Sequence, residues 1–148
     1  MNREYRGVAS EALVEQAIQV IRRKSDDKLP RIQSYMHAYP NSGLDRRGID
    51  FLVRFENGLE IPLQVKSSTR GKRKFERAHR SGPFIPVVIA SIDEEIGIII
   101  NRVIQCMRLA INRVMRQVEK QRSMLQRRIR SIKNRDQCNR YFAARMCH

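Results

Sequence analysis

Residues 48–68, GIDFLVRFENGLEIPLQVKSS, decide the expected fold. Apolar and polar residues alternate on both sides of Asn57-Gly58, and a period of two is typical of half-buried β-strands. The alternation places Phe51, Val53 and Phe55 on one face of the first strand. An Asn-Gly pair between two such runs is a common hairpin turn. The sequence therefore predicts two antiparallel strands joined by a tight connection.

The register of this hairpin is predicted by matching its apolar faces. A two-residue turn would mix apolar and polar side chains across the pair, because side chains alternate between faces. A three-residue loop of residues 57–59 instead pairs Phe51 with Val65 and Val53 with Leu63. We therefore expect the three-residue loop.

The same register brings three polar side chains to one end of the hairpin. Asp50 opens the first strand, Gln64 and Lys66 close the second, and the pairing sets Asp50 beside Lys66. One interpretation is a plain cross-strand ion pair, worth about 0.2–1 kcal/mol at a surface. The other is a site in which an acid, an amide and an amine act together.

The segment before the hairpin predicts a helix over residues 3–24. Val14, Ile18 and Ile21 recur at helical spacing, and Glu11 falls on the same inward face. A carboxylate on an apolar face is unfavourable unless it is paired, hydrogen-bonded or bound to a cation. An acid at the rim of the first turn, favoured by the helix dipole, is the alternative.

A strand is expected within residues 31–38, with Ile32, Ser34 and Met36 on one face. We expect His37 to be an ordinary strand-end residue without a role in chemistry. Residues 39–48 are rich in turn-forming residues and predict a loop.

After the hairpin, residues 71–80 predict a basic helix and the β-branched run over 84–90 predicts a buried strand. From about Asp93 the pattern becomes helical and stays so. Whether residues 97–100 belong to this helix or to a short strand is left open by the pattern. The whole sequence thus predicts an α/β fold, with a mixed sheet of four or five strands flanked by helices and a long basic C-terminal helix.

The charge of the chain is distributed unevenly. The 148 residues have a net charge of +15; residues 1–100 hold 17 basic and 13 acidic residues, whereas residues 101–148 hold 13 and 2. We therefore expect a single domain, with an α/β core over residues 1–100 and a basic helical extension over 101–148 that packs on or continues this domain. Such an excess of positive charge favours a polyanionic partner, most commonly nucleic acid. An acidic membrane surface or an acidic protein is the alternative.

Other partners and locations are predicted from the apolar pattern. No apolar stretch approaches the roughly 20 residues that span a bilayer, and the N-terminus lacks a secretory apolar region, so we expect a cytoplasmic protein that does not enter membranes. Apolar residues recur at intervals of three and four along the long helix, and this row is compatible with a homodimer; its residues are Ile96, Ile100, Val103, Met107, Ile111, Val114 and Val118.

The order helix, strand, hairpin, helix, strand, together with the motifs GID (48–50) and QVK (64–66), resembles the PD-(D/E)XK nuclease superfamily. The helix RGVASEALVEQAIQVI (6–21) resembles the first helix of its resolvase-like branch. The resemblance covers roughly residues 5–92. It implies a restriction-endonuclease-like core and a metal-dependent endonuclease that hydrolyses phosphodiester bonds in DNA, structure-selective rather than sequence-specific.

The resemblance also implies roles for four catalytic residues. Asp50 and Glu11 would bind the metal, Mg²⁺ or Mn²⁺, and Lys66 would polarise the attacking water and offset negative charge. Gln64 stands where most members carry Glu or Asp, so it would be a ligand without charge. That departure leaves an alternative, a catalytically weak or inactive nucleic-acid-binding module on the same fold.

Basic residues directly after the motif lysine are the expected contacts to DNA phosphates. A second alternative is a structural RNA-binding protein that depends on the arginine-rich C-terminal region. The expected phosphate contacts are Arg70, Lys72, Arg73, Lys74, Arg77 and Arg80.

Overall fold

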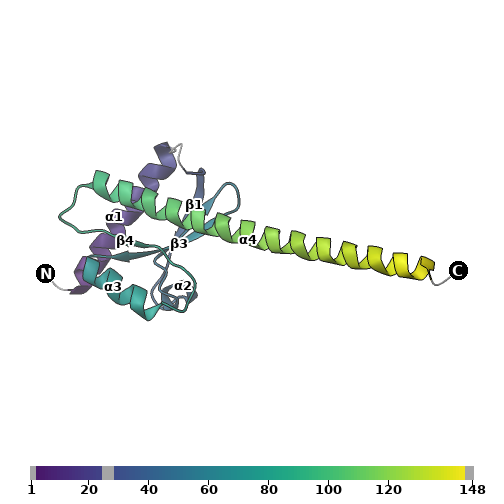
Figure 1. Cartoon of the computed structure of the whole chain (residues 1–148). Coiled ribbons are helices and arrows are strands. Elements are labelled where there is room, and N and C mark those ends of the chain that lie inside the picture. The colour runs from purple at the N-terminus through teal and green to yellow at the C-terminus, as the bar shows by residue number, and fades with distance from the viewer. Residues whose placement is uncertain (1–2, 25–28, 146–148) are drawn as a thin grey trace. The chain divides into compact units, whose positions relative to one another are not determined.

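Helices and strands follow one another in the order expected from the sequence, with one additional short helix in the loop (Figure 1). The computed structural model describes the backbone of residues 3–24 and 29–145, and the side chains of residues 5–24 and 29–135. The elements are α1 (Arg3–Lys24), β1 (Ile32–His37), α2 (Gly43–Arg46), β2 (Phe51–Phe55), β3 (Glu60–Lys66), α3 (Thr69–Ala78), β4 (Val87–Ile89) and α4 (Ile96–Arg145).

The four strands form one mixed sheet in the order β1-β2-β3-β4. β1 and β2, and β2 and β3, pair antiparallel, whereas β3 and β4 pair parallel. A parallel pair needs a crossover connection, and α3 forms part of it. The predicted α/β class, the mixed sheet and the long C-terminal helix are therefore confirmed.

The predicted register of the hairpin is wrong by two residues. Phe51 pairs with Leu63 rather than with Val65, and Val53 pairs with Ile61. The connection has three residues as expected, but it consists of residues 56–58, since the amide of Phe55 donates to the carbonyl of Leu59 at 2.9 Å. A shift of two preserves both faces of each strand, so face matching alone does not distinguish the two registers.

Gly58 explains which register the chain adopts. Its φ of +81° is a left-handed conformation that favours glycine. In a three-residue hairpin loop the last residue takes this conformation, so the loop ends at Gly58 and begins at Glu56. The consequence is that Asp50 lies beside Gln64 rather than beside Lys66.

The predicted faces of β1 are also wrong. The ladder with β2 shifts between Ile32 and Ser34, as it does at a β-bulge, and this exchanges the two faces of the strand beyond it. Met36, expected on the face of Ile32, is 55% exposed. Tyr35 and His37 instead reach side chains of α1.

The core lies where α1 covers the sheet. Val14 and Ile18 on α1 are completely buried, as are Phe51, Val53 and Phe55 on one face of β2. These are the faces that the sequence periodicity predicts. α1 packs against β1 and β3, and α3 packs against β3 and β4.

α4 begins within the α/β unit and continues beyond it. The chain divides into two compact units between Ile111 and Asn112, so the first turns of α4 belong to the α/β unit. There, the side chains of Arg102 and Cys106 donate to the carbonyls of Ile89 and Val87, at 2.9 and 3.6 Å. Residues 97–100, left open by the sequence, are helical. None of the helices in the described residues has the length and apolar character needed to cross a membrane.

Candidate active site and basic groove

Asp50 is held at the start of β2 by contacts of its backbone and its carboxyl group. Its amide donates to the carbonyl of Leu63 at 2.9 Å. One carboxyl oxygen, Oδ2, accepts from the amide of Val65 at 2.6 Å and also from the side-chain amide of Gln64. These bonds thus hold Asp50 against the end of β3, immediately before β2 begins.

Burial raises the pKa of Asp50 from 3.8 to about 6. The hydrogen bond from Val65 opposes this shift, since it favours the charged form. The negative charge of Glu11 adds to the increase, and the positive charges of Lys66 and His37 reduce it. Asp50 therefore lies within electrostatic reach of one other acid and two basic side chains.

Glu11 belongs to a row of polar side chains on α1 that contact β1. Its Oε2 lies 3.1 Å from Nε2 of His37, and Oε2 of Glu15 lies 3.7 Å from Nδ1 of the same ring. Tyr35 donates its hydroxyl hydrogen to Oε1 of Glu15 at 3.0 Å, and Gln19 donates to the Tyr35 oxygen at 2.8 Å. Glu11 is thus half-buried and hydrogen-bonded.

His37 is the side chain near the site that the sequence interpretation missed. Its ring stacks on Phe51, with centroids 4.4 Å apart, and links Glu11 to Glu15. The missed signal was the spacing of Glu11, Glu15 and Gln19, which places three polar side chains on one stripe of a helix that covers a sheet. Such a stripe requires polar partners on the strand below it.

Lys66 lies at the end of β3, and its position is fixed by α3. Nζ is 5.5 Å from the centre of the Phe75 ring, a cation–π distance. Only Ser67 and Ser68 separate β3 from α3, and the Ser68 hydroxyl accepts from the amide of Gly71 at 3.2 Å to cap the helix. This short connection holds Lys66 against the first turns of α3.

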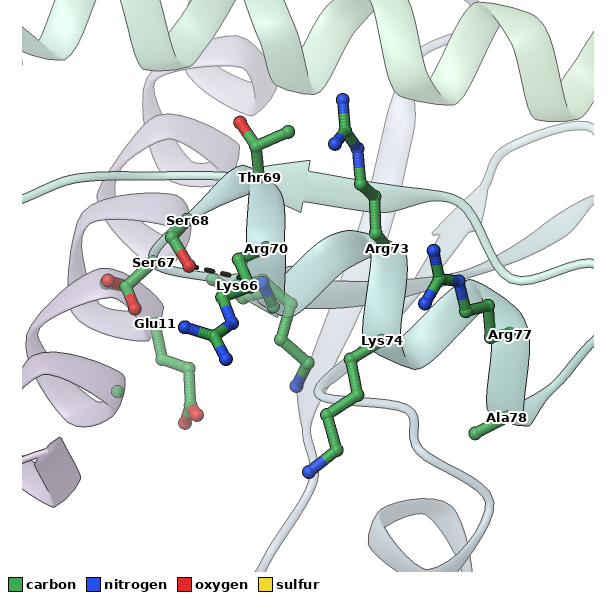
Figure 2. A pocket seen from close by; sticks show the side chains of 14 residues that line it. Glu11, Lys66, Ser67, Ser68, Thr69, Arg70, Arg73, Lys74, Arg77 and Ala78 are labelled. Atoms are coloured by element: carbon green, nitrogen blue, oxygen red, sulfur yellow. Dashed lines mark hydrogen bonds between the residues drawn. The ribbon is translucent and has the colours of Figure 1, made fainter.

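An open groove of about 1460 Å³ joins Glu11 and Lys66 to the basic face of α3. Figure 2 shows the side chains of Glu11, Lys66 and Lys74 extending toward the same side. Helical spacing places the basic residues of α3 that line the groove on one face of that helix. We name it the basic groove; its charged residues are Glu11, Lys66, Arg70, Arg73, Lys74 and Arg77.

The structure separates the six expected phosphate contacts into two groups. Four of them line the basic groove. The other two are outside its lining: Lys72 is 3.9 Å from Glu76 in an (i, i+4) ion pair, and Arg80 follows the C-terminus of α3.

Gln64 is buried, with 3% of its surface exposed, and its amide nitrogen has two hydrogen-bond partners. The nitrogen donates to Asp50 and, at 3.2 Å, to the carbonyl of Val65. This orientation suits an ionised Asp50, because the amide oxygen would repel a carboxylate. Within the described residues, no three or more His, Cys, Asp and Glu side chains are grouped so that they could hold a metal ion.

The structure thus brings Glu11, Asp50, Gln64 and Lys66 to one end of the sheet, with Glu11 and Lys66 in the basic groove and Asp50 hydrogen-bonded to Gln64. Comparison with known proteins adds no family to this geometry: no protein-family model, no curated protein and no solved structure matches the chain.

Proposed function

We propose that the protein is a metal-dependent DNA endonuclease of the PD-(D/E)XK type, with residues 1–100 as its restriction-endonuclease-like core. The order of helices and strands and the mixed sheet support this proposal. The observation that carries it is the basic groove, in which a carboxylate and a lysine lie beside a row of arginine and lysine side chains, next to the desolvated Asp50. The proposal keeps the cytoplasmic location expected from the sequence.

The charges at the site suit a divalent cation. Asp50 is poorly solvated, and the nearby Glu11 raises its pKa further, so a cation held by both carboxylates would offset both effects. Glu11 and Asp50 are the residues that would hold Mg²⁺ or Mn²⁺, with the amide oxygen of Gln64 as the third expected ligand. When bound, such a metal polarises the phosphoryl oxygen and lowers the pKa of a water molecule.

The remaining residues position the substrate and offset its charge. Lys66 supplies a point charge beside the two acids, where negative charge develops on a phosphate under attack. The amide nitrogen of Gln64 holds the Asp50 carboxyl in one orientation. Arginine and lysine on α3 bind phosphates without reading bases, so we propose that the enzyme selects DNA by structure rather than by sequence.

A second candidate is a DNA-binding module without cleavage. The observation in its favour is that Glu11 and Gln64 already have polar partners within the chain, in His37 and Asp50. In that function the same groove would bind DNA, and the acids would only support the fold.

Cleavage assays distinguish these candidates. Labelled four-way junction, flap, duplex and single-stranded DNA are incubated with Mg²⁺, with Mn²⁺ and with a chelator. We expect cleavage only with metal, and fastest on a branched substrate. Lys66→Met should reduce the cleavage rate by a factor on the order of 10²–10³ while it leaves DNA bound. Lys133→Met, in the exposed part of α4, is the matched control and should cleave at the wild-type rate.

DNA binding without metal-dependent cleavage on any of the four substrates would establish the binding module instead. If the Lys66→Met protein cleaves as fast as the wild type, the activity does not belong to this site.

A further inference from the structure

Among the described side chains of α4 beyond Asn112, six large apolar ones are exposed, and five of them lie on one face of the helix; Met124 lies outside that face. Between 50% and 58% of the surface of each of the five is accessible. An exposed apolar stripe of this length on a single helix is typical of a surface that another molecule covers. We name it the apolar stripe; its residues are Met115, Val118, Leu125, Ile129 and Ile132.

The spacing of the stripe is that of a helix that packs against another helix. Its members alternate at intervals of three and four, as do the a and d positions of a heptad repeat. Arg122 occupies the one position in this alternation that is not apolar. A single polar residue at such a position selects the partner, at some expense of stability.

The charge of this segment disfavours a second copy of the chain as the occupant. Residues 112–135 hold nine basic residues and one acid, Glu119. Two copies side by side would place like charges along both flanks of the seam, within about one Debye length of each other. A second copy of the chain, as in the homodimer that the sequence pattern allows, is therefore the less favourable occupant. An acidic partner is complementary in charge.

A small hollow on the same segment has the same mixed character. It is open to solvent, has a volume of about 220 Å³, and lies between the side chains of Gln121, Met124, Leu125 and Arg128. Its two apolar side chains and one arginine would suit an apolar side chain that has a carboxylate beside it. Nucleic acid would satisfy the basic side chains but would leave the apolar stripe exposed to water.

We propose that residues 112–135 form a docking site for an acidic amphipathic helix of another protein. Apolar residues of that helix cover the apolar stripe, and its Glu or Asp residues face Arg122 and Arg128. This partner site is independent of the nuclease activity, since none of its residues lies in the basic groove. It gives the enzyme a means of recruitment by a partner protein.

The test uses the full-length protein and a labelled peptide of about four heptads, with Leu at a and d and Glu at e and g. A second peptide carries Lys in place of Glu. Binding is followed by fluorescence anisotropy at physiological salt, and sedimentation of the protein alone reports its self-association. We expect the acidic peptide to bind in the micromolar range and the basic peptide not to bind.

Two matched pairs of variants locate the interaction. Arg122→Glu and Arg127→Glu change the charge equally, but Arg127 lies on the face opposite the apolar stripe. We expect the first to weaken binding at least about tenfold and the second about twofold or less. Leu125→Asn should weaken binding to a similar extent as Arg122→Glu, and Ser123→Asn, outside the stripe, should not. Circular dichroism checks that each variant keeps its helix content.

Three results would overturn the proposal. Binding of neither peptide, or of both equally, shows that no acidic helix is selected. Equal losses in Arg122→Glu and Arg127→Glu show a general attraction between charges rather than docking on the stripe. A wild-type dimer at micromolar concentration that Leu125→Asn dissociates shows that a second copy covers the stripe.

Discussion

The basic face of α3 and the C-terminal part of α4 contain the same residue types and differ in what surrounds them. On α3, arginine and lysine share a groove with Glu11 and Lys66, next to the desolvated Asp50. Over residues 112–135, charged and apolar side chains alike are mostly exposed. A count of charges would assign both regions to nucleic acid. Because their surroundings differ, we propose chemistry for the first and protein docking for the second.

Burial, more than charge, distinguishes the candidate site from the C-terminal part of α4. Asp50 has a raised pKa because it is desolvated, whereas the hydrogen bond from Val65 only moderates the effect. In a less polar environment every charge interacts more strongly with its neighbours. Substitutions around the site should therefore have larger effects than the same substitutions in exposed segments.

The largest effect on stability is expected at Gly48, which lies two residues before Asp50 and three before the start of β2. Its φ of +71° is left-handed, and an added Cβ would lie 2.6 Å from Cε2 of Phe75. Gly48→Ala should destabilise the fold by about 3 kcal/mol, from backbone strain together with overpacking. Gly58→Ala has a similar φ of +81° but open space around the added atom, so it should show the strain alone, about 1–2 kcal/mol. Urea unfolding measures both, and equal losses would contradict a tightly packed site.

A substitution at Asp50 is expected to have a smaller effect on the free energy of unfolding, and of the opposite sign. At about pH 7 the folded protein holds this carboxylate ionised although burial raises its pKa to about 6. Asp50→Asn removes that charge, and should stabilise the metal-free protein by about 1–3 kcal/mol. Glu119→Gln, on the exposed part of α4, should change stability by less than about 0.5 kcal/mol. Thermal unfolding in chelator compares them.

The stabilisation by Asp50→Asn should depend on pH in one direction. The folded protein binds the Asp50 proton more tightly than the unfolded chain does, because its pKa is raised from 3.8. As the pH falls from about 6 to about 4, the wild type therefore becomes more stable relative to the variant. At about pH 4 the difference between their free energies of unfolding should vanish. A difference that is constant across this range would show that charge is not its cause.

The smallest effect is expected from single charge reversals on DNA affinity. Lys74→Glu in the basic groove should weaken binding to duplex DNA about tenfold and reduce the slope of log K against log salt by about one. Lys133→Glu makes the same reversal on α4 and should change the affinity about twofold or less. Equal losses would mean that both basic regions bind DNA, which would remove the distinction between them.

Much of the fold could be predicted from the sequence, because periodicity reports which face of an element is buried. α1, β2 and the fully buried Phe51, Val53 and Phe55 follow from apolar spacing alone. The hairpin register could not be obtained that way, because a shift of two keeps each apolar face intact. The left-handed requirement of Gly58 decides it, and that signal was present in the sequence.

The candidate site was predictable as a set of residues but not as a network. The bulge in β1 turns His37 toward Glu11. No local pattern in residues 31–38 predicts this bulge. The bond between Gln64 and Asp50 likewise depends on the true register. Contacts between elements distant in sequence are therefore what the sequence interpretation lacked.

The most direct test of the account is the number of Mn²⁺ ions that the protein binds, counted by electron paramagnetic resonance of free Mn²⁺ during titration. We predict one site in the wild type, weakened at least about tenfold in Glu11→Gln and in Asp50→Asn. Glu56→Gln, which removes an exposed acid next to Arg31, should bind as the wild type does. A wild type that binds no Mn²⁺, or a Glu11→Gln protein that binds it equally well, would contradict the claim that these two acids hold a metal.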